Sequence, residues 1–370
     1  MSARIEAASR QGLKVTNFAA GRPDFDSPLH IKEATRQAMD DGWVHYAKTI
    51  GLDALRETVA ERLGEDFGLD IDSNQVLVTF GSTEAMFVVL QSILNPGDEV
   101  LTPEPMYVYY EGWIALGGAR MVPIPLSATE NFSLKAKHIR PKLSPRTKGL
   151  ILNNPHNPTG QLIEEEVLLE IAELAEREDF FVICDDVYNY LLYDDARRFS
   201  IASVPGMESR AIIVGSLSKT YAMDGWRLGY IIGPKPVIER ALKVHQYAVG
   251  CVNTFIQFGA QAALGGPQDC VRKMLVEYDR RRIFMMSCLD DLNIPYVRPR
   301  GAFYVFPDIS RFGMNSQAFS DYLFREAQVA VVPGEAFGPS GEGHIRMAYC
   351  LPFPEIAQGL ERMRSAIEKL

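Results

Sequence analysis

One stretch of the chain reads Ser216-Leu217-Ser218-Lys219-Thr220-Tyr221-Ala222-Met223-Asp224-Gly225-Trp226-Arg227, and a short apolar run at 211–215 precedes it. That run, Ala-Ile-Ile-Val-Gly, is rich in β-branched residues and closes with a glycine. This pattern predicts a fully buried strand that ends in a turn. The strand would deliver Lys219 to the edge of a sheet, with hydroxyl groups on either side and the fixed cation of Arg227 after it.

Lys219 is placed to act as a nucleophile. A lysine at the rim of a sheet can be desolvated, lose its proton near neutral pH and attack a carbonyl group. Ser216, Ser218 and Arg227 could hold an anion beside it. A reactive amine next to an anion site suggests an aldehyde that carries a phosphate, which describes pyridoxal 5'-phosphate (PLP).

Other interpretations of this stretch are weaker. Ser216 and Lys219 match the S-x-x-K pattern of serine acyl-transfer enzymes, but the chain contains neither S-D-N nor K-T-G. Lys219-Thr220 matches the end of a phosphate-binding P-loop, but Ser218 stands where that motif needs glycine. On this stretch alone, a solvated surface lysine remains the alternative.

The composition excludes several classes of protein. The chain has 370 residues, 47% of them hydrophobic and 23% charged, and its net charge of −9 argues against binding to nucleic acid or acidic membranes. The five cysteines show no C-x-x-C pair, and the six histidines show no metal-binding spacing. The start of the chain lacks an apolar signal segment, and no long apolar run follows. We therefore expect a cytoplasmic, soluble protein without a catalytic metal.

Strand and helix patterns alternate in the middle of the chain. The run 75–80 predicts a strand, and Ser82 is a suitable N-cap for a helix from Thr83 to Leu94. The N-terminus of that helix would suit an anion. Further strands are predicted at 149–152 and 180–184, before the strand that leads to Lys219. This alternation predicts an α/β fold with a mostly parallel sheet.

Polar side chains follow the predicted strand ends, namely Ser82, Asn157, Asp185 and Lys219. Because ligands bind at the carboxyl ends of parallel strands, we expect these four side chains to meet at one edge of the sheet. The run 227–232 predicts one further strand, antiparallel to its neighbours. A long helix from 266 to 292, short strands near 301–306, 329–332 and 344–349, and two more helices predict a smaller α+β domain. We expect residues 45–265 to form the large domain, and residues 1–44 and 266–370 the small one.

A resemblance rests on motifs spread over nearly the whole chain. The chain resembles the PLP-dependent aminotransferases of class I/II, which have fold type I. The stretches that carry the resemblance are Gly21-x-Pro23-Asp24-Phe25, Tyr46, Gly51-x-x-x-Leu55-Arg56, Asn153-x-Pro155-x-Asn157-Pro158-x-Gly160, Asp185-x-x-Tyr188, Ser216-x-Ser218-Lys219, Gly225-x-Arg227-x-Gly229, Gly301-Ala302-Phe303-Tyr304, Pro333-Gly334-x-Ala336-Phe337-Gly338 and Ile345-Arg346. Any one of these motifs is weak, but the ordered set is specific.

The resemblance implies roles for the catalytic residues. Lys219 would hold PLP as a Schiff base and, once released by substrate, move the proton from the substrate Cα. Asp185 would face the pyridine nitrogen and keep the ring protonated, so that the ring draws electrons from Cα. Asn157 and Tyr188 would bind the phenolic oxygen of the ring. Without the resemblance, Asp185 would be read as a helix cap and Asn157 as a turn residue.

The resemblance also implies how cofactor and substrate are held. Tyr107 would stack on the pyridine ring, with Tyr109 and Tyr110 as close rivals. The phosphate would be bound by Ser82, Thr83, Ser216, Ser218 and Arg227. Tyr46 would reach the phosphate from the neighbouring subunit of a homodimer with shared active sites. Arg346 would bind the substrate α-carboxylate as a bidentate donor, and the backbone of Gly21 would pass close to it.

The implied reaction is the transfer of an amino group between an amino acid and a 2-oxo acid, by ping-pong exchange between PLP and pyridoxamine phosphate. The same scaffold serves C–S β-lyases, which is the alternative activity, and the effector-sensing halves of transcription regulators. The latter carry an N-terminal DNA-binding domain, whereas here the motifs of the fold begin already at Gly21, which argues against a regulator. Two residues depart from the pattern, Arg22 and Asp224. Our hypothesis is that Arg22 biases the choice of substrate.

Overall fold

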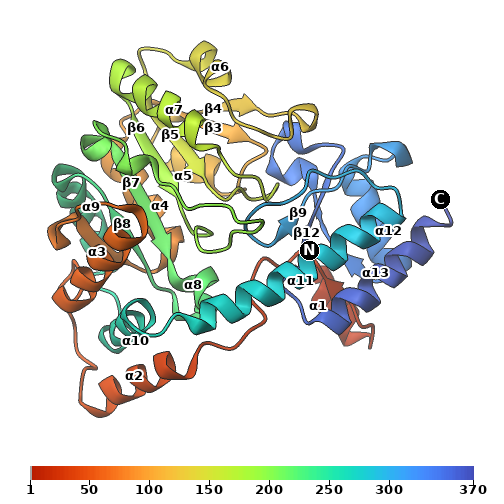
Figure 1. Cartoon of the computed structure of the whole chain (residues 1–370), viewed down its shortest axis with the longest axis horizontal. Helices are drawn as coiled ribbons and strands as arrows, with labels where there is room; N and C mark the ends of the chain where they lie inside the picture. Colours follow the sequence, from red (N-terminus) through yellow and green to blue (C-terminus); the bar gives the residue numbers. More distant parts are fainter. Residues whose placement is uncertain (1) are drawn as a thin grey trace.

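The computed structural model describes residues 2–370 and contains a large central sheet of seven strands (Figure 1). In chain order the strands are β2 (Val76–Thr79), β3 (Glu99–Glu104), β4 (Arg120–Pro125), β5 (Thr147–Asn153), β6 (Phe181–Asp185), β7 (Ala211–Ser216) and β8 (Gly229–Ile232). Their order in the sheet is β2-β8-β7-β6-β5-β3-β4. The neighbours from β7 to β4 are parallel, whereas β8 runs antiparallel to β7 and β2. The predicted mostly parallel sheet and its antiparallel strand are confirmed.

Both faces of the sheet are buried along β2, β6, β7 and β8, which explains why these strands are almost continuous apolar runs. Side chains alternate along β7: Ile213 belongs to the core on one face, and Ile212 and Val214 belong to the core on the other. The first core takes residues from α3 (Asp53–Phe67), α7 (Glu165–Glu178) and α10 (Thr254–Gly265). The second takes residues from α4 (Gly81–Ile93), α5 (Tyr110–Leu116) and α9 (Lys235–Ala248). The architecture is therefore three-layered, as fold type I requires.

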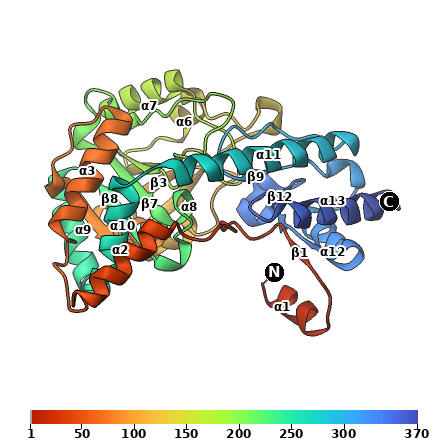
Figure 2. The same ribbon diagram turned by 60° about the horizontal axis from the view of Figure 1, so that its bottom comes forward.

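A smaller part lies beside the large sheet and has its own core (Figure 1, Figure 2). It contains an antiparallel sheet of β11 (Val332–Pro333), β12 (Ile345–Ala348) and β9 (Tyr304–Val305), and a parallel pair of β1 (Thr16–Asn17) and β10 (Val329–Ala330). Its helices are α1 (Ser2–Arg10), α12 (Ser316–Ala327) and α13 (Phe353–Ile367). The long helix α11 (Asp269–Asp291) connects α10 with this part.

Three short or peripheral helices complete the fold: α2 (Leu29–Asp40), α6 (Ala136–Ile139) and α8 (Leu217–Thr220). Helix α2 packs on α10, so its Ile31 belongs to a core of the large sheet although we assigned residues 1–44 to the small domain. The division at 45–265 stays a prediction. Within residues 2–370, we find no helix that is both long and apolar enough to cross a membrane.

Candidate active site

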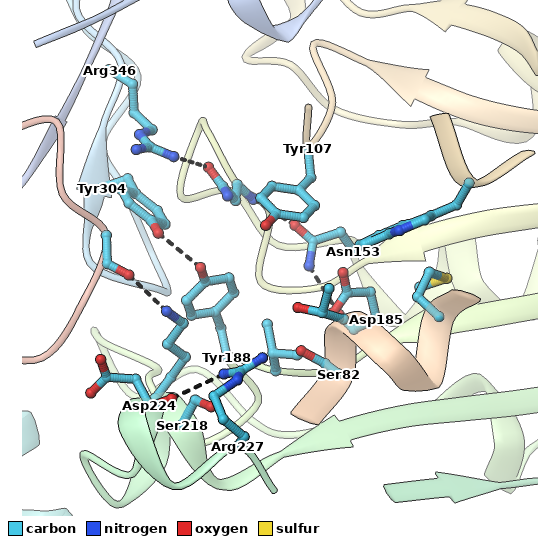
Figure 3. A pocket seen from close by; sticks show the side chains of 17 residues that line it. Ser82, Tyr107, Asn153, Asp185, Tyr188, Ser218, Asp224, Arg227, Tyr304 and Arg346 are labelled. Atoms are coloured by element: carbon cyan, nitrogen blue, oxygen red, sulfur yellow. Dashed lines mark hydrogen bonds between the residues drawn. The ribbon is translucent and has the colours of Figure 1, made fainter. Parts of the chain in front are cut away.

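The carboxyl ends of the parallel strands open into a cavity of about 240 Å³ (Figure 3). Because parallel strands end at one edge of the sheet, polar residues that are far apart in sequence meet there. The predicted site residues that line the cavity are Gly21, Ser82, Thr83, Tyr107, Asn157, Asp185, Tyr188, Ser218, Lys219, Arg227 and Arg346. The structure thus brings most of the predicted site together.

Lys219 lies in α8, the short helix that directly follows β7. Ser216 caps this helix, since its hydroxyl accepts a hydrogen bond from the Ser218 N–H at 3.1 Å. The Nζ atom of Lys219 donates to the backbone oxygen of Gly21 at 2.7 Å (Figure 3). Burial lowers the pKa of Lys219, because water no longer stabilises the ammonium form. An amine of this kind is available as a nucleophile and as a proton acceptor.

Asp185 is the last residue of β6 and is buried beside the cavity. Its Oδ2 accepts a hydrogen bond from the buried hydroxyl of Tyr110. Its Oδ1 has no hydrogen-bond partner among the described residues. Burial raises the pKa of Asp185 to about 6, against the opposing effect of the Tyr110 hydrogen bond. An unpaired buried carboxylate oxygen is costly, so this site fits a ligand that brings a donor, as the protonated ring nitrogen of PLP would.

A chain of hydrogen bonds fixes the loop that follows β5. The side-chain amide of Asn153 donates to the Asp185 backbone oxygen at 2.9 Å, and its Oδ1 accepts from the Asn157 N–H at 2.7 Å. The Oδ1 of Asn157 accepts from Nη1 of Arg346 at 3.0 Å (Figure 3). Nη2 of Arg346 donates to the Ala19 backbone oxygen at 2.8 Å. Arg346 is therefore oriented by the protein and points its guanidinium toward the cavity, as a carboxylate-binding arginine must.

The end of the cavity that lies opposite Arg346 is suited to a phosphate. Helix α4 begins at Gly81, so the backbone N–H groups and positive dipole of its first turn lie beside Ser82 and Thr83. Arg227 adds a guanidinium, whose Nη1 donates to the Asp224 backbone oxygen at 2.9 Å. Gly229 allows this close packing, because a Cβ atom there would lie only 2.8 Å from the Ser82 nitrogen. A helix N-terminus and an arginine together form an anion site that fits the PLP phosphate.

Tyr107, Tyr109 and Tyr110 lie in clearly different environments in the structure. Tyr107 lines the cavity, whereas Tyr109 is 54% exposed. Tyr110 is buried and contacts Tyr107 edge to face at 5.6 Å between ring centroids. The position of Tyr107 is compatible with the predicted stacking role. The bond between Tyr110 and Asp185 was missed, because nothing in the sequence shows which tyrosine of this segment points inward.

Two predicted cofactor-binding residues do not line the cavity. The Ser216 hydroxyl is engaged in capping α8. Tyr46 is 98% exposed on the surface of the chain. Their proposed contacts with the phosphate stay predictions. Arg22 also lies outside the lining, whereas Asp224, the other residue that departs from the family pattern, is part of it.

Sequence reasoning missed other lining residues, namely Met86, Trp113, Asn153, Val187 and Tyr304. Asn153 and Tyr304 belong to motifs that we quoted, so their place in a motif was the available signal. Met86, Trp113 and Val187 gave no such signal, because apolar residues of this kind are indistinguishable from core residues in sequence.

Comparisons with known proteins agree with this geometry. The family model "Aminotransferase class I and II" matches residues 14–363. An aspartate aminotransferase of Pyrococcus abyssi is 40% identical over 97% of this chain and 93% of its own length. An aromatic-amino-acid aminotransferase 2 of Thermococcus litoralis is 38% identical over 97% of this chain and 93% of its own. The crystal structure of an aromatic aminotransferase from Pyrococcus horikoshii superposes with a TM-score of 0.95, at 39% identity and with 99% of each chain covered. The chain therefore belongs to the class I and II aminotransferases, a PLP-dependent family of fold type I, and it is an aminotransferase.

Proposed function

We propose that this chain moves the amino group of a 2-amino acid to a 2-oxo acid in the cavity that Lys219 lines, with Lys219 as the catalytic amine. The observation that carries the proposal is the joint placement of Lys219 and Asp185 in one cavity that has an arginine at each end. Arg346 lines the cavity and is suited to a carboxylate, and Arg227 with the N-terminus of α4 is suited to a phosphate. A substrate amino acid and PLP carry these two anions.

The residues of the chain have distinct tasks in this reaction. PLP, when bound, supplies the aldehyde that takes up the amino group and the ring that accepts the electron pair left at Cα. Asp185 would hold the ring-nitrogen proton, and Asn157 and Tyr188 would donate to the phenolic oxygen. Arg346 would fix the substrate carboxylate, which orients the Cα–H bond. The unprotonated Nζ of Lys219 would then take the proton from Cα and hold it.

The test separates an aminotransferase from a C–S β-lyase on the same scaffold. With an amino acid alone, an aminotransferase consumes about one equivalent per active site and then stops until a 2-oxo acid is added. A lyase continues to turn over and releases ammonia. Because relatives are named for aspartate and for aromatic amino acids, these donors and alanine form the first panel. Continuous ammonia release without an oxo acid would overturn the proposed reaction.

Lys219 can be tested directly. Borohydride reduction of the PLP-loaded protein should attach the cofactor permanently to the peptide that contains Lys219. The Lys219→Ala variant should bind PLP reversibly and lose transamination. Wild-type rates in this variant would contradict the role of Lys219.

We further propose a homodimer with shared active sites and a cytoplasmic location. Tyr46 is 98% exposed, and Trp43 and Val44 beside it in the chain are also exposed, which supports an interface around Tyr46. Mixing Tyr46→Phe and Lys219→Ala subunits should then change the activity in a way that the separate homodimers cannot explain. All five cysteines are free, which supports a reducing compartment, and cell fractionation would test it.

A further inference from the structure

The ring of Tyr304 lies between two residues with predicted binding roles. The Cζ atom of Arg346 lies 4.4 Å from the centroid of the Tyr304 ring, a cation–π contact. On the other side, the Tyr304 hydroxyl lies 2.8 Å from the Tyr188 hydroxyl (Figure 3). Tyr304 lines the cavity and is only 2% exposed. One buried side chain thus contacts both Arg346 and Tyr188.

The backbone holds Tyr304 in this place. In the small sheet, Tyr304 of β9 is the register partner of Ala348 in β12. Arg346 precedes Ala348 by two residues, so the side chains of Arg346 and Ala348 point to the same face of the sheet. Tyr304, the register partner of Ala348, shares that face. The ring of Phe303 packs edge to face on Tyr304, with 4.9 Å between centroids. Gly21 closes the other side, because a Cβ there would lie 2.1 Å from the Tyr304 hydroxyl. The tyrosine therefore has little freedom to move.

The hydroxyl of Tyr304 keeps its proton at neutral pH. Burial raises the pKa of Tyr304 to about 12, although the charge of Arg346 acts in the opposite direction. Burial also raises the pKa of Tyr188 well above its usual range. Between two neutral hydroxyls at hydrogen-bond distance, one donates its proton and the other accepts it. When Tyr304 donates to Tyr188, the proton of Tyr188 is free for an acceptor in the cavity.

We propose that Tyr304 is a positioning residue that couples the carboxylate-binding arginine to the tyrosine that binds the cofactor oxygen. Its ring holds the Arg346 guanidinium in the orientation that grips a carboxylate. Its hydroxyl orients the Tyr188 hydroxyl toward the cavity. This inference rests on the proposed function, from which the roles of Arg346 and Tyr188 come.

Two substitutions separate the ring from the hydroxyl. Tyr304→Phe keeps the ring, so kcat should fall about 3- to 10-fold while KM for donor and acceptor stays within about twofold. Tyr304→Leu removes the ring, so KM for both substrates should rise about 3- to 30-fold. The dissociation constants of succinate and 3-phenylpropionate, which carry a carboxylate but no amino group, should rise in parallel in Tyr304→Leu only. Intrinsic fluorescence of the PLP-loaded protein measures this binding.

Tyr193→Phe is the matched control. Tyr193 is also buried, and its hydroxyl donates to the Ala302 backbone oxygen at 2.6 Å, but it does not line the cavity. The control should keep wild-type kcat and KM. The inference is wrong if Tyr304→Phe raises KM as much as Tyr304→Leu, or if neither variant differs from the control.

The outcomes also separate this inference from the proposed function. If Tyr304→Leu does not fold, Tyr304→Phe decides alone, since a fall in kcat at constant KM is required. If the wild type transaminates and the variants match it, only the inference on Tyr304 fails. If the wild type does not transaminate, the proposed reaction fails, and carboxylate binding still tests the contact between Tyr304 and Arg346.

Discussion

Replacing Tyr110 with phenylalanine should make Asp185 lose its charge at a higher pH. The Tyr110 hydroxyl donates to Oδ2 of Asp185, and both groups are buried. Burial raises the pKa of Asp185 to about 6, and the hydrogen bond limits that rise. A hydrogen bond to a charged group contributes about 1.5–3 kcal/mol, and about 1.4 kcal/mol corresponds to one pKa unit. The variant should therefore have an Asp185 pKa about one to two units higher.

The sign of the effect on PLP binding follows from the charge of Asp185. Above its pKa, Asp185 is an anion and can pair with a protonated ring nitrogen, and below it the carboxyl group is neutral and cannot. Wild-type affinity for PLP should fall as the pH drops through about 6. In Tyr110→Phe the same loss should occur about one to two pH units higher, whereas well above both midpoints the two proteins should bind PLP alike.

The assay is a titration of the apoprotein with PLP across a pH series, followed by fluorescence quenching. Tyr107→Phe is the control, because it removes a hydroxyl from the same cavity and leaves the bond between Tyr110 and Asp185 in place. Titration of PLP itself contributes equally to all three proteins. A midpoint for Tyr110→Phe that coincides with those of the wild type and the control would refute the reasoning.

Further substitutions test the two anion sites and the choice of substrate. Arg346→Lys should raise KM for donor and acceptor about tenfold, because a lysine cannot bind a carboxylate through two parallel hydrogen bonds, and steady-state kinetics measures this. Gly229→Ala should destabilise the fold by about 1–3 kcal/mol, since its Cβ would lie 2.8 Å from the Ser82 nitrogen, and urea unfolding measures this. Asp224→Asn should favour acidic donors over alanine, because it removes a negative charge from the cavity lining, and the ratio of kcat/KM values reports it. Arg22→Ala should change relative rates on glutamate, alanine and aromatic donors, and unchanged ratios would dismiss our hypothesis on Arg22.

The sequence was sufficient for the strands that contain a buried apolar run of three or more residues. Strands β5, β6 and β7 are buried on both faces and contain no proline, so their runs were recognisable. Strands β3 and β4 were missed because each contains proline, which normally argues against a strand. Both are compatible with the sheet: β4 is at its edge, and β5 pairs with β3 only along Glu99–Leu101, before Pro103. Whether a strand tolerates a proline depends on the position of that strand in the sheet, and the local sequence does not reveal this position.

The candidate site was predictable where a residue follows a strand end or belongs to a family motif. Asp185 and Lys219 satisfy both conditions, and both line the cavity. Tyr110 and Tyr304 act through their contacts with other side chains, and those contacts span 75 and 116 positions in the chain. Pairings over such separations arise only from the folded arrangement, so no local pattern could have assigned them.

The arrangement of charge explains how one amine can serve as nucleophile and then as base. Burial is the main reason for the lowered pKa of Lys219. Cys350 and Asp224 act in the opposite direction, and the guanidinium groups of Arg346 and Arg227 contribute in the same direction as burial. Both arginines are also the groups suited to the two anions of the reaction. When a carboxylate and a phosphate are bound, they offset the positive charges that disfavour the ammonium form. The same arginines therefore help burial to lower the pKa of Lys219 when no anion is bound. Once a carboxylate and a phosphate are bound, this contribution is smaller and Lys219 becomes a stronger base.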